Sequence, residues 1–176
     1  MSQQQIKPSI IFIDLDNFKP INDQFGHIVG DEVLKQFANR VRQIVRKEDT
    51  FARLGGDEFI ILIENLTSMC GPEAVTRSIQ KSLKEPLHVA NTTINMTCSM
   101  GVAICPDNGF HSSTLLQHAD TALCRAKELG RDNCQFFTRE MNSFLEKNRR
   151  VEHELKQAIG NKQFVVCYQA VKALDT

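Results

Sequence analysis

The chain has 176 residues with 21 basic and 21 acidic side chains, so its formal net charge is zero. This length supports one domain with an appended element, and the balanced charge argues against non-specific binding to nucleic acid or an anionic membrane. No apolar run approaches the roughly 20 residues of a membrane span, and the six cysteines contain no Cys-x-x-Cys pair, which together favour a cytoplasmic protein with free thiols.

Hydrophobic periodicity and turn residues predict an α+β fold for most of the chain. A continuous apolar run predicts a strand buried on both faces, helical spacing predicts amphipathic helices, and the Gly55-Gly56 pair predicts a β-hairpin. In chain order, we expect a strand over 9–14, a helix over 30–46, hairpin strands over 50–54 and 59–64, a helix over 73–84, a strand over 92–105 with a bulge at Gly101, a helix over 113–129 and a strand over 133–138. This order fits a ferredoxin-like or palm-type central antiparallel sheet flanked by helices.

The character of the chain changes after Thr138. Residues 139–159 are charged, with apolar residues at helical spacing, and residues 163–169 have the pattern of a strand with no later partner. We therefore expect a first domain over 1–138, a connector helix over 139–162 and the truncated start of a second domain over 163–176.

Acidic residues follow or precede two of the predicted strands. Asp14 and Asp16 end the first apolar run, whereas Asp57 and Glu58 come directly after the glycine pair. If the two strands are neighbours, these carboxylates form an oxygen-rich pocket suited to Mg²⁺. The alternative is a surface turn with solvated acids.

Five short motifs occur in a fixed order and together resemble the GGDEF family. They are Asp14-Leu15-Asp16-Asn17-Phe18-Lys19, Asn22-Asp23, Gly26-His27, Gly30-Asp31 and Gly55-Gly56-Asp57-Glu58-Phe59. The family's members are diguanylate cyclases, which condense two GTP molecules into cyclic di-GMP. The tail from Met141 to Ala170 resembles the connector and first strand of an EAL phosphodiesterase domain, which implies a fragment of a GGDEF–EAL tandem protein. The resemblance also implies a preceding helix that is missing from this chain.

The resemblance implies a metal-dependent catalytic centre. Asp14, Asp57 and the carbonyl of Leu15 correspond to the metal ligands, with Mg²⁺ or Mn²⁺ as the cofactor. Asp57, Glu58 and Lys19 correspond to catalytic residues, Glu58 assisting in deprotonation of the attacking 3′-hydroxyl. Cations would neutralise phosphate charge and lower the pKa of that hydroxyl. Asp16 is expected either as a metal ligand or as a capping or supporting group.

The resemblance also implies a GTP site around these acids. The backbone at Asn17 and Phe18, together with Lys127 and Arg131, corresponds to the triphosphate-binding groups, which phosphate requires as charge-assisted donors. A basic last helical turn is the alternative interpretation for Lys127.

Asn22 and Asp31 correspond to the guanine-binding pair of the family. A carboxylate can accept hydrogen bonds from guanine N1–H and N2–H₂, and adenine lacks the second of these donors. The alternative for Asp31 is a helix N-cap after Gly30.

A separate inhibitory site for cyclic di-GMP is implied by Arg46 and Asp49, which form an Arg-x-x-Asp motif six residues before Gly55. Arg77 corresponds to a contact that a second subunit supplies to this site. The alternative is a basic helix end followed by a loop acid.

The resulting hypothesis is a diguanylate cyclase with product inhibition, whose partners are GTP, cyclic di-GMP and a second copy needed for turnover. The alternative is a non-catalytic GTP-binding module that regulates an attached cyclic di-GMP phosphodiesterase. No nucleic-acid partner and no membrane segment are expected in this chain, although its parent protein could be tethered to a membrane elsewhere.

Overall fold

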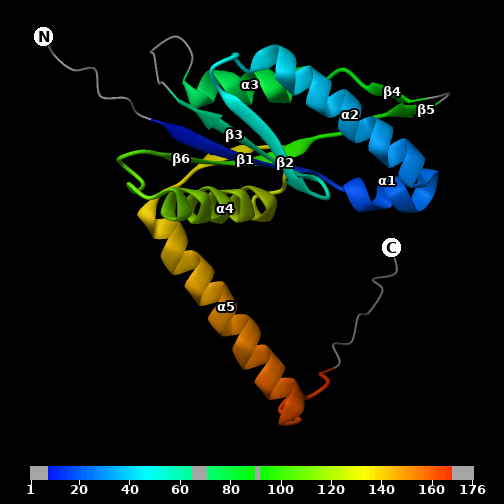
Figure 1. Cartoon of the computed structure of the whole chain (residues 1–176). Coiled ribbons are helices and arrows are strands. Elements are labelled where there is room, and N and C mark those ends of the chain that lie inside the picture. Colours follow the sequence, from blue (N-terminus) through cyan, green and yellow to red (C-terminus); the bar gives the residue numbers. More distant parts are fainter. Residues whose placement is uncertain (1–7, 65–70, 90–91, 168–176) are drawn as a thin grey trace, which may run out of the picture. The chain divides into compact units, whose positions relative to one another are not determined.

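A five-stranded sheet forms the centre of the protein, in the order β2-β3-β1-β6-β7 (Figure 1). The computed structural model describes residues 8–64, 71–89 and 92–167. The strands of this sheet are β1 (Ser9–Leu15), β2 (Thr50–Gly55), β3 (Glu58–Ile63), β6 (Cys98–Ile104) and β7 (Cys134–Phe136). Strand β1 is buried along its whole length, because it lies between β3 and β6 and is covered on both faces.

Helices cover both faces of this sheet. On one face, α2 (His27–Ile44) and α3 (Pro72–Ser82) pack their apolar stripes on the main core, which also contains alternate residues of β1, β3 and β6. On the other face, α4 (Ser112–Glu128) packs on β1 and β6 through Leu115, Ala119 and Leu123. The α+β fold with a central sheet flanked by helices is confirmed, with one refinement: β7 pairs with β6 in parallel, whereas the other pairs are antiparallel.

Gly101 lies at the closest contact between β6 and α4. The register from Leu15↔Cys98 to Ser9↔Ile104 is unbroken through Gly101, so the expected bulge is absent. A Cβ atom at this position would lie 2.1 Å from the carbonyl oxygen of Ala119 and 2.2 Å from the nitrogen of Leu123. The glycine is therefore required because the helix backbone approaches the strand too closely for any side chain.

The expected strand over 92–105 is two strands. Its first part forms β5 (Thr92–Ile94), which pairs with β4 (Leu87–Val89) in a separate two-stranded sheet, and its second part forms β6. Periodicity alone did not show the break, because both parts are rich in apolar and β-branched residues. The chain leaves the hairpin at Met96, whose side chain is buried in the main core.

A short helix, α1 (Phe18–Phe25), precedes α2 and was not predicted from the sequence. Its pattern is weak because it contains Pro20, Asn22 and Asp23. The helix is stabilised by tertiary packing, since Phe18 is buried and Ile21 packs against the main core.

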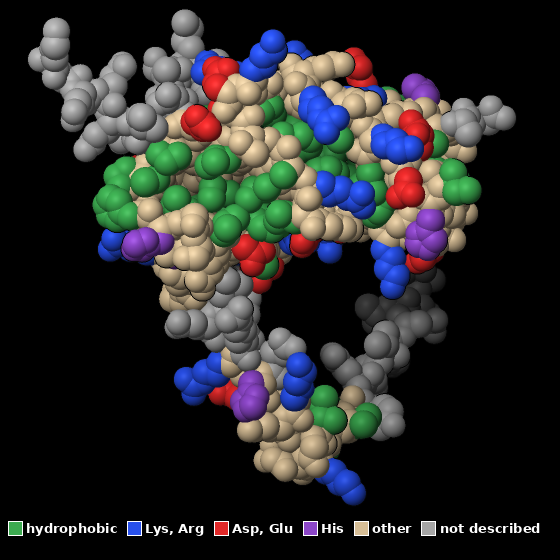
Figure 2. Space-filling model, in the orientation of Figure 1, with side chains coloured by type: hydrophobic (Ala, Val, Ile, Leu, Met, Phe, Trp, Pro, Cys, Tyr) green, Lys and Arg blue, Asp and Glu red, His purple; other side chains and the backbone are tan. Residues whose placement is uncertain are grey.

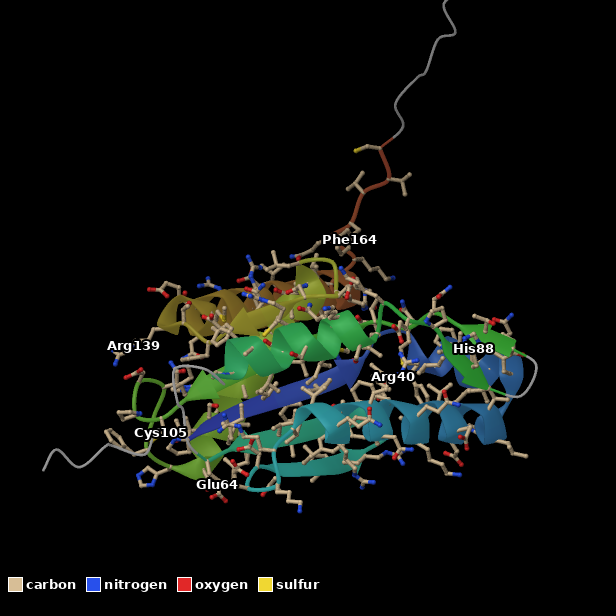
Figure 3. The ribbon with its side chains drawn as sticks, turned by 90° about the horizontal axis from the view of Figure 1, so that it is seen from above. Arg40, Glu64, His88, Cys105, Arg139 and Phe164 are labelled. Carbon is tan, nitrogen blue, oxygen red and sulfur yellow. The ribbon has the colours of Figure 1, made fainter. Side chains whose placement is uncertain are left out.

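Arg40 fixes α2 to the segment that follows α3 (Figure 3). Its guanidinium donates hydrogen bonds to the carbonyl oxygens of Ser82, Glu85 and Pro86, at 2.6, 2.5 and 2.7 Å. These carbonyl groups belong to the end of the helix and the loop beyond it, where the backbone lacks intrahelical partners.

The chain divides into two compact units, residues 1–141 and 142–176. Helix α5 (Arg139–Gly160) begins in the first and continues through the second. Residues 163–167 form no strand, contrary to expectation, and the rest of that predicted strand lies outside the described residues. Within the described part of the chain, no helix is long and apolar enough to span a membrane.

The face of the first unit seen in Figure 2 carries a gathering of hydrophobic side chains. Ile60 and Leu62 of β3 are only partly buried against the smaller core under α4. Among the described residues, Cys98, Cys105, Cys134 and Cys167 form no disulfide. Burial raises the pKa of the Cys98 thiol well above its usual value and that of Cys134 to about 11, so both stay protonated at neutral pH.

Candidate functional site

The acids at the ends of β1 and β3 lie together, as expected from the sequence. Glu58 is paired across the strands with Asp14, and the Leu15 N–H donates to the carbonyl oxygen of Asp57 at 3.2 Å. Gly56 turns the hairpin with a φ of 53°, a conformation that glycine adopts without a steric penalty. Asp14, Asp57 and Glu58 therefore lie at the same end of the paired strands β1 and β3.

Arg53 braces the same hairpin. Its Nε and Nη2 atoms donate to the carbonyl oxygen of Gly56, at 2.9 and 2.7 Å. The contact fixes the turn that carries Asp57, and a β-bulge lies beside it, between Arg53 and Gly55. The sequence interpretation assigned no role to Arg53, although an arginine two residues before a glycine pair was the available signal.

Asp14 is the most constrained acid of the group. Its Oδ2 lies 2.7 Å from the Nζ of Lys127, which comes from the last turn of α4. Burial raises the pKa of the Asp14 carboxyl above its usual value; the hydrogen bond and the charge of Lys127 act in the opposite direction, and the nearby charges of Asp57 and Asp16 raise it further. Positive charge is therefore favoured at this point, and the lysine supplies it in this structure.

A polar hollow of about 400 Å³ opens over these acids. The lining residues come from β1, the start of α1, the hairpin and the end of α4, and they are Asp14, Leu15, Asn17, Phe18, Lys19, Pro20, Asp57, Lys127 and Arg131. All the residues predicted to bind metal or triphosphate are thus brought to one place. Glu58 is exposed at the first position of β3 and is not among the lining residues.

Backbone geometry at two loops shapes this hollow. Asn17 has a φ of 56°, after which α1 begins at the buried Phe18. Arg131 has a φ of 64°, and Asn133 Nδ2 donates to its carbonyl oxygen at 2.8 Å and to that of Ala126 at 2.8 Å. The asparagine thereby holds the loop that presents Arg131, a role the sequence interpretation did not assign.

Asp16 supports the site rather than lining it. The carboxylate is 5% exposed, and it accepts hydrogen bonds from Thr97 Oγ1 and Ser99 Oγ, both at 2.7 Å, and from the Asp132 N–H at 3.1 Å. Both oxygens are therefore used within the protein. Of the two roles expected for Asp16, the structure favours the supporting one, because the network ties the end of β1 to the loop after α4.

Asn22 and Asp31 lie on α1 and α2, which pack against each other. Helix α2 begins at His27, so the interpretation of Asp31 as its N-cap is wrong. The Asp31 side chain is exposed and borders a hollow of about 620 Å³ whose floor includes Phe51 and Phe59, rings that stack 5.6 Å apart.

The residues predicted for the inhibitory site lie in two places in the chain. Arg46 and Asp49 belong to one turn, closed by the Asp49 N–H and the Arg46 carbonyl oxygen at 3.2 Å, and Asp49 Oδ1 accepts from the Glu64 N–H at 3.3 Å. Arg46 lies 3.8 Å from Glu48 in an ion pair. Arg77 lies on α3 and borders a hollow whose lining residues include neither Arg46 nor Asp49.

The comparisons with known proteins agree on one family. A family model described as "Diguanylate cyclase, GGDEF domain" matches residues 1–133. The cyclic di-GMP phosphodiesterase NbdA of Pseudomonas aeruginosa is 37% identical over 166 residues, covering 94% of this chain and 21% of that protein. The bifunctional diguanylate cyclase/cyclic di-GMP phosphodiesterase MucR of the same organism is 36% identical over 161 residues, covering 92% and 23%. The chain thus spans about a fifth of the length of these relatives.

Among solved structures, a truncated TpbB from Pseudomonas aeruginosa that comprises only its GGDEF domain superposes with a TM-score of 0.78. It is 33% identical in sequence, and the match covers 81% of this chain and 83% of that one. The structural likeness therefore extends over the sheet and the helices that build the hollow.

Proposed function

Because the chain belongs to the GGDEF, or diguanylate cyclase, domain family, we propose that it binds GTP and condenses two GTP molecules into cyclic di-GMP. The observation that carries this proposal is the polar hollow in which Asp14 and Asp57 face the cations Lys19, Lys127 and Arg131. Such a combination suits a nucleoside triphosphate with its divalent cation, because both the metal and the phosphates find groups of opposite charge.

The acids of the hollow fit a divalent cation. Mg²⁺ or Mn²⁺ prefers hard oxygen ligands, which are offered here by Asp14, Asp57 and the carbonyl of Leu15. Burial and the negative charge of Asp57 both disfavour the charged form of the Asp14 carboxyl unless a positive charge lies beside it. Within the described residues no three His, Cys, Asp or Glu side chains are placed so that together they could hold a metal ion, so the remaining ligands would come from the backbone, the phosphates or water. A bound divalent cation would neutralise phosphate charge and lower the pKa of the attacking hydroxyl.

The residues of the chain would orient the triphosphate. The first turn of α1 after Asn17 leaves backbone N–H groups without helical partners, and Lys19 extends from the same turn. Lys127 and Arg131 approach from the end of α4. Lys127 would exchange its contact with Asp14 for a phosphate when the nucleotide and metal enter. Glu58, exposed beside the hollow, would accept the proton of the 3′-hydroxyl.

Guanine would be bound by Asn22 and Asp31. The exposed Asp31 carboxylate can accept from guanine N1–H and N2–H₂, whereas adenine has an unprotonated N1 and no 2-amino group. Asp31→Ala is expected to weaken GTP binding by about 1–3 kcal/mol and to leave ATP binding nearly unchanged in calorimetry. Equal affinities of the unmodified protein for GTP and ATP would contradict this assignment.

Turnover requires two chains. A hollow of about 400 Å³ over one pair of acids accommodates the reacting end of one GTP, whereas the reaction joins two. We therefore expect two GGDEF domains to face each other, with each hydroxyl directed at the other's triphosphate, and cyclic di-GMP to inhibit through Arg46, Asp49 and Arg77 at a distance from the hollow.

A second function is favoured by one comparison. NbdA is named a phosphodiesterase although it matches nearly the whole of this chain, and this chain matches only about a fifth of it. A domain of this kind could bind GTP without turnover and regulate an attached phosphodiesterase.

Incubation of the full chain with GTP and Mg²⁺, followed by chromatography, separates the two functions. Cyclic di-GMP should form, and Asp57→Ala should reduce it to background. Asp23→Ala is the matched control, because Asp23 is an exposed acid of α1 outside the hollow. Wild-type turnover by the Asp57 variant would refute the metal assignment, and GTP binding without any product would favour the regulatory function.

A further inference from the structure

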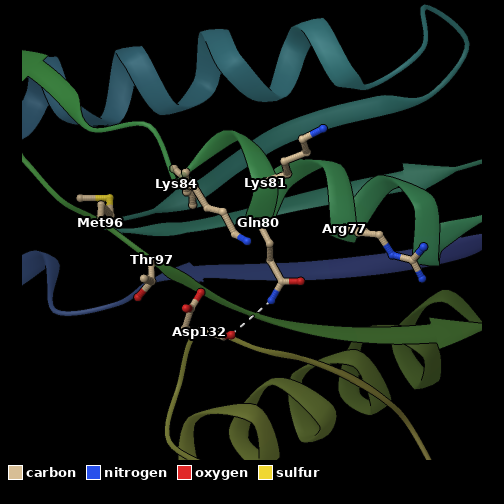
Figure 4. A pocket seen from close by; sticks show the side chains of 8 residues that line it. Arg77, Gln80, Lys81, Lys84, Met96, Thr97 and Asp132 are labelled. Atoms are coloured by element: carbon tan, nitrogen blue, oxygen red, sulfur yellow. Dashed lines mark hydrogen bonds between the residues drawn. The ribbon is translucent and has the colours of Figure 1, made fainter.

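A basic hollow beside α3 is separate from the nucleotide hollow (Figure 4). Its volume is about 400 Å³, and no residue lines both hollows. Three cations, Arg77, Lys81 and Lys84, stand against one carboxylate, that of Asp132. Their spacing of four and three residues places them on one side of α3 and its continuation, so positive charge is concentrated there in a chain whose net charge is zero.

This positive charge is not neutralised by nearby acids. In the described part of the chain, none of the recorded ion pairs involves Arg77, Lys81 or Lys84. In Figure 4 the Lys84 and Gln80 side chains reach toward Thr97 and Asp132, on the opposite wall. Uncompensated cations around a concave surface favour the binding of an anion.

The opposite wall is held in a fixed shape. Thr97 Oγ1 and the Asp132 N–H both donate to Asp16, at 2.7 and 3.1 Å, and Gln80 Nε2 donates to the Asp132 carbonyl oxygen at 3.2 Å. Met96, at the same wall, is 4% exposed. Because these groups are already bonded or packed, little ordering is required when a ligand enters, which favours binding.

We propose that this hollow binds a small anion carrying phosphate groups. Lysine and arginine supply the charge-assisted donors that phosphate oxygens require, and the volume lies within the roughly 300–1,000 Å³ of small-molecule sites. A long polyanion is disfavoured because the chain as a whole carries no net charge. The site takes its ligand independently of GTP. It depends on Lys81 and Lys84 rather than on Arg77, which is assigned above to inhibition by cyclic di-GMP, and neither Arg46 nor Asp49 lines it.

Calorimetric titration of the full chain with inorganic pyrophosphate, without GTP, tests the proposal. Pyrophosphate can also bind Lys127 and Arg131, so two binding events are expected in the unmodified protein. Lys84→Gln and Lys81→Gln should each weaken the affinity of the binding event at the hollow beside α3 by about fivefold or more, because each removes a charge-assisted donor. Lys127→Gln should weaken only the other, and Lys47→Gln, an exposed lysine outside both hollows, should change neither.

The proposal is overturned if neither Lys81→Gln nor Lys84→Gln alters the titration, or if Lys127→Gln alone removes all binding. A second calorimetric titration, with sulfate in place of pyrophosphate, compares the affinities of the two anions. Equal affinity for sulfate and pyrophosphate in the event that depends on Lys84 would indicate an adventitious ion only. A preference for pyrophosphate that disappears in Lys84→Gln would support the assigned site.

Discussion

Gly101→Ala is expected to force β6 and α4 apart. The added Cβ would lie 2.1 Å from the oxygen of Ala119 and 2.9 Å from the carbonyl carbon of Ala122. Both are backbone atoms, so no side-chain rotation can relieve the contact. Extending 2.1 Å to a distance above 3.0 Å requires a shift of about 1 Å in a close-packed interior.

The free energy of unfolding should fall by about 3 kcal/mol, the upper end of the usual cost of overpacking. With a urea dependence of about 2 kcal/mol per molar, the midpoint of unfolding should drop by roughly 1.5 M while the slope stays constant. The matched control is Gly71→Ala, because Gly71 has a φ of −69° and no atom of the described residues lies within 4 Å of the position that its added Cβ would occupy. Its cost as an N-cap change should stay below about 1 kcal/mol.

The same substitution should weaken GTP binding. Helix α4 carries Lys127, whose Nζ lies 2.7 Å from Asp14 in the polar hollow, so a displaced helix moves this cation away from the acids. Urea unfolding and calorimetry with GTP measure the two effects. Loss of less than about 1 kcal/mol for Gly101→Ala, equal to the control, would refute the close approach of strand and helix.

Three further changes are informative. Gly30→Ala should displace the Asn22 side chain, since the new Cβ would lie 1.9 Å from its Oδ1, and calorimetry should show weaker GTP binding with little change in stability. Asp14→Asn should raise the free energy of unfolding at pH 7 and abolish metal binding. Because the pKa of Asp14 is raised in the folded state, the unmodified protein loses stability as the pH rises from 3.8 through the folded-state pKa. Urea unfolding at several pH values should therefore show that the variant is more stable above this pH range and equally stable below it. Asp16→Ala should cost about 3 kcal/mol or more in the same assay, because it leaves an N–H and two hydroxyls without their charged acceptor.

Local pattern was sufficient for the elements that carry the acids. An apolar run ending in Asp14 and a glycine pair followed by Asp57 predicted a strand and a hairpin, and their pairing in the sheet brought the carboxylates together. Helix α1 was missed because its propensity is poor, and the packing of Phe18 and Ile21 against the main core explains it.

The network of Asp16 was beyond any local pattern. Its partners Thr97, Ser99 and Asp132 are 81, 83 and 116 residues away in sequence. Short polar side chains at such separations carry no periodicity, so only the assembled sheet shows that the Asp16 carboxylate is enclosed. The sequence therefore predicted which acids meet, but could not separate the acid that faces the hollow from the acid that supports it.

Strained backbone is concentrated around the same hollow, which argues against a solvated surface turn. Asn17, Arg131 and Asp132 have φ values of 56°, 64° and 48°, and the left-handed region costs about 1–2 kcal/mol for a residue with a side chain. Two of them are held in place, because the Asp132 N–H donates to Asp16 and Asn133 Nδ2 donates to the Arg131 carbonyl oxygen. A solvated surface turn would not be expected to contain strained residues held by such hydrogen bonds. A site that directs cations and backbone N–H groups at one phosphate chain would be expected to contain them.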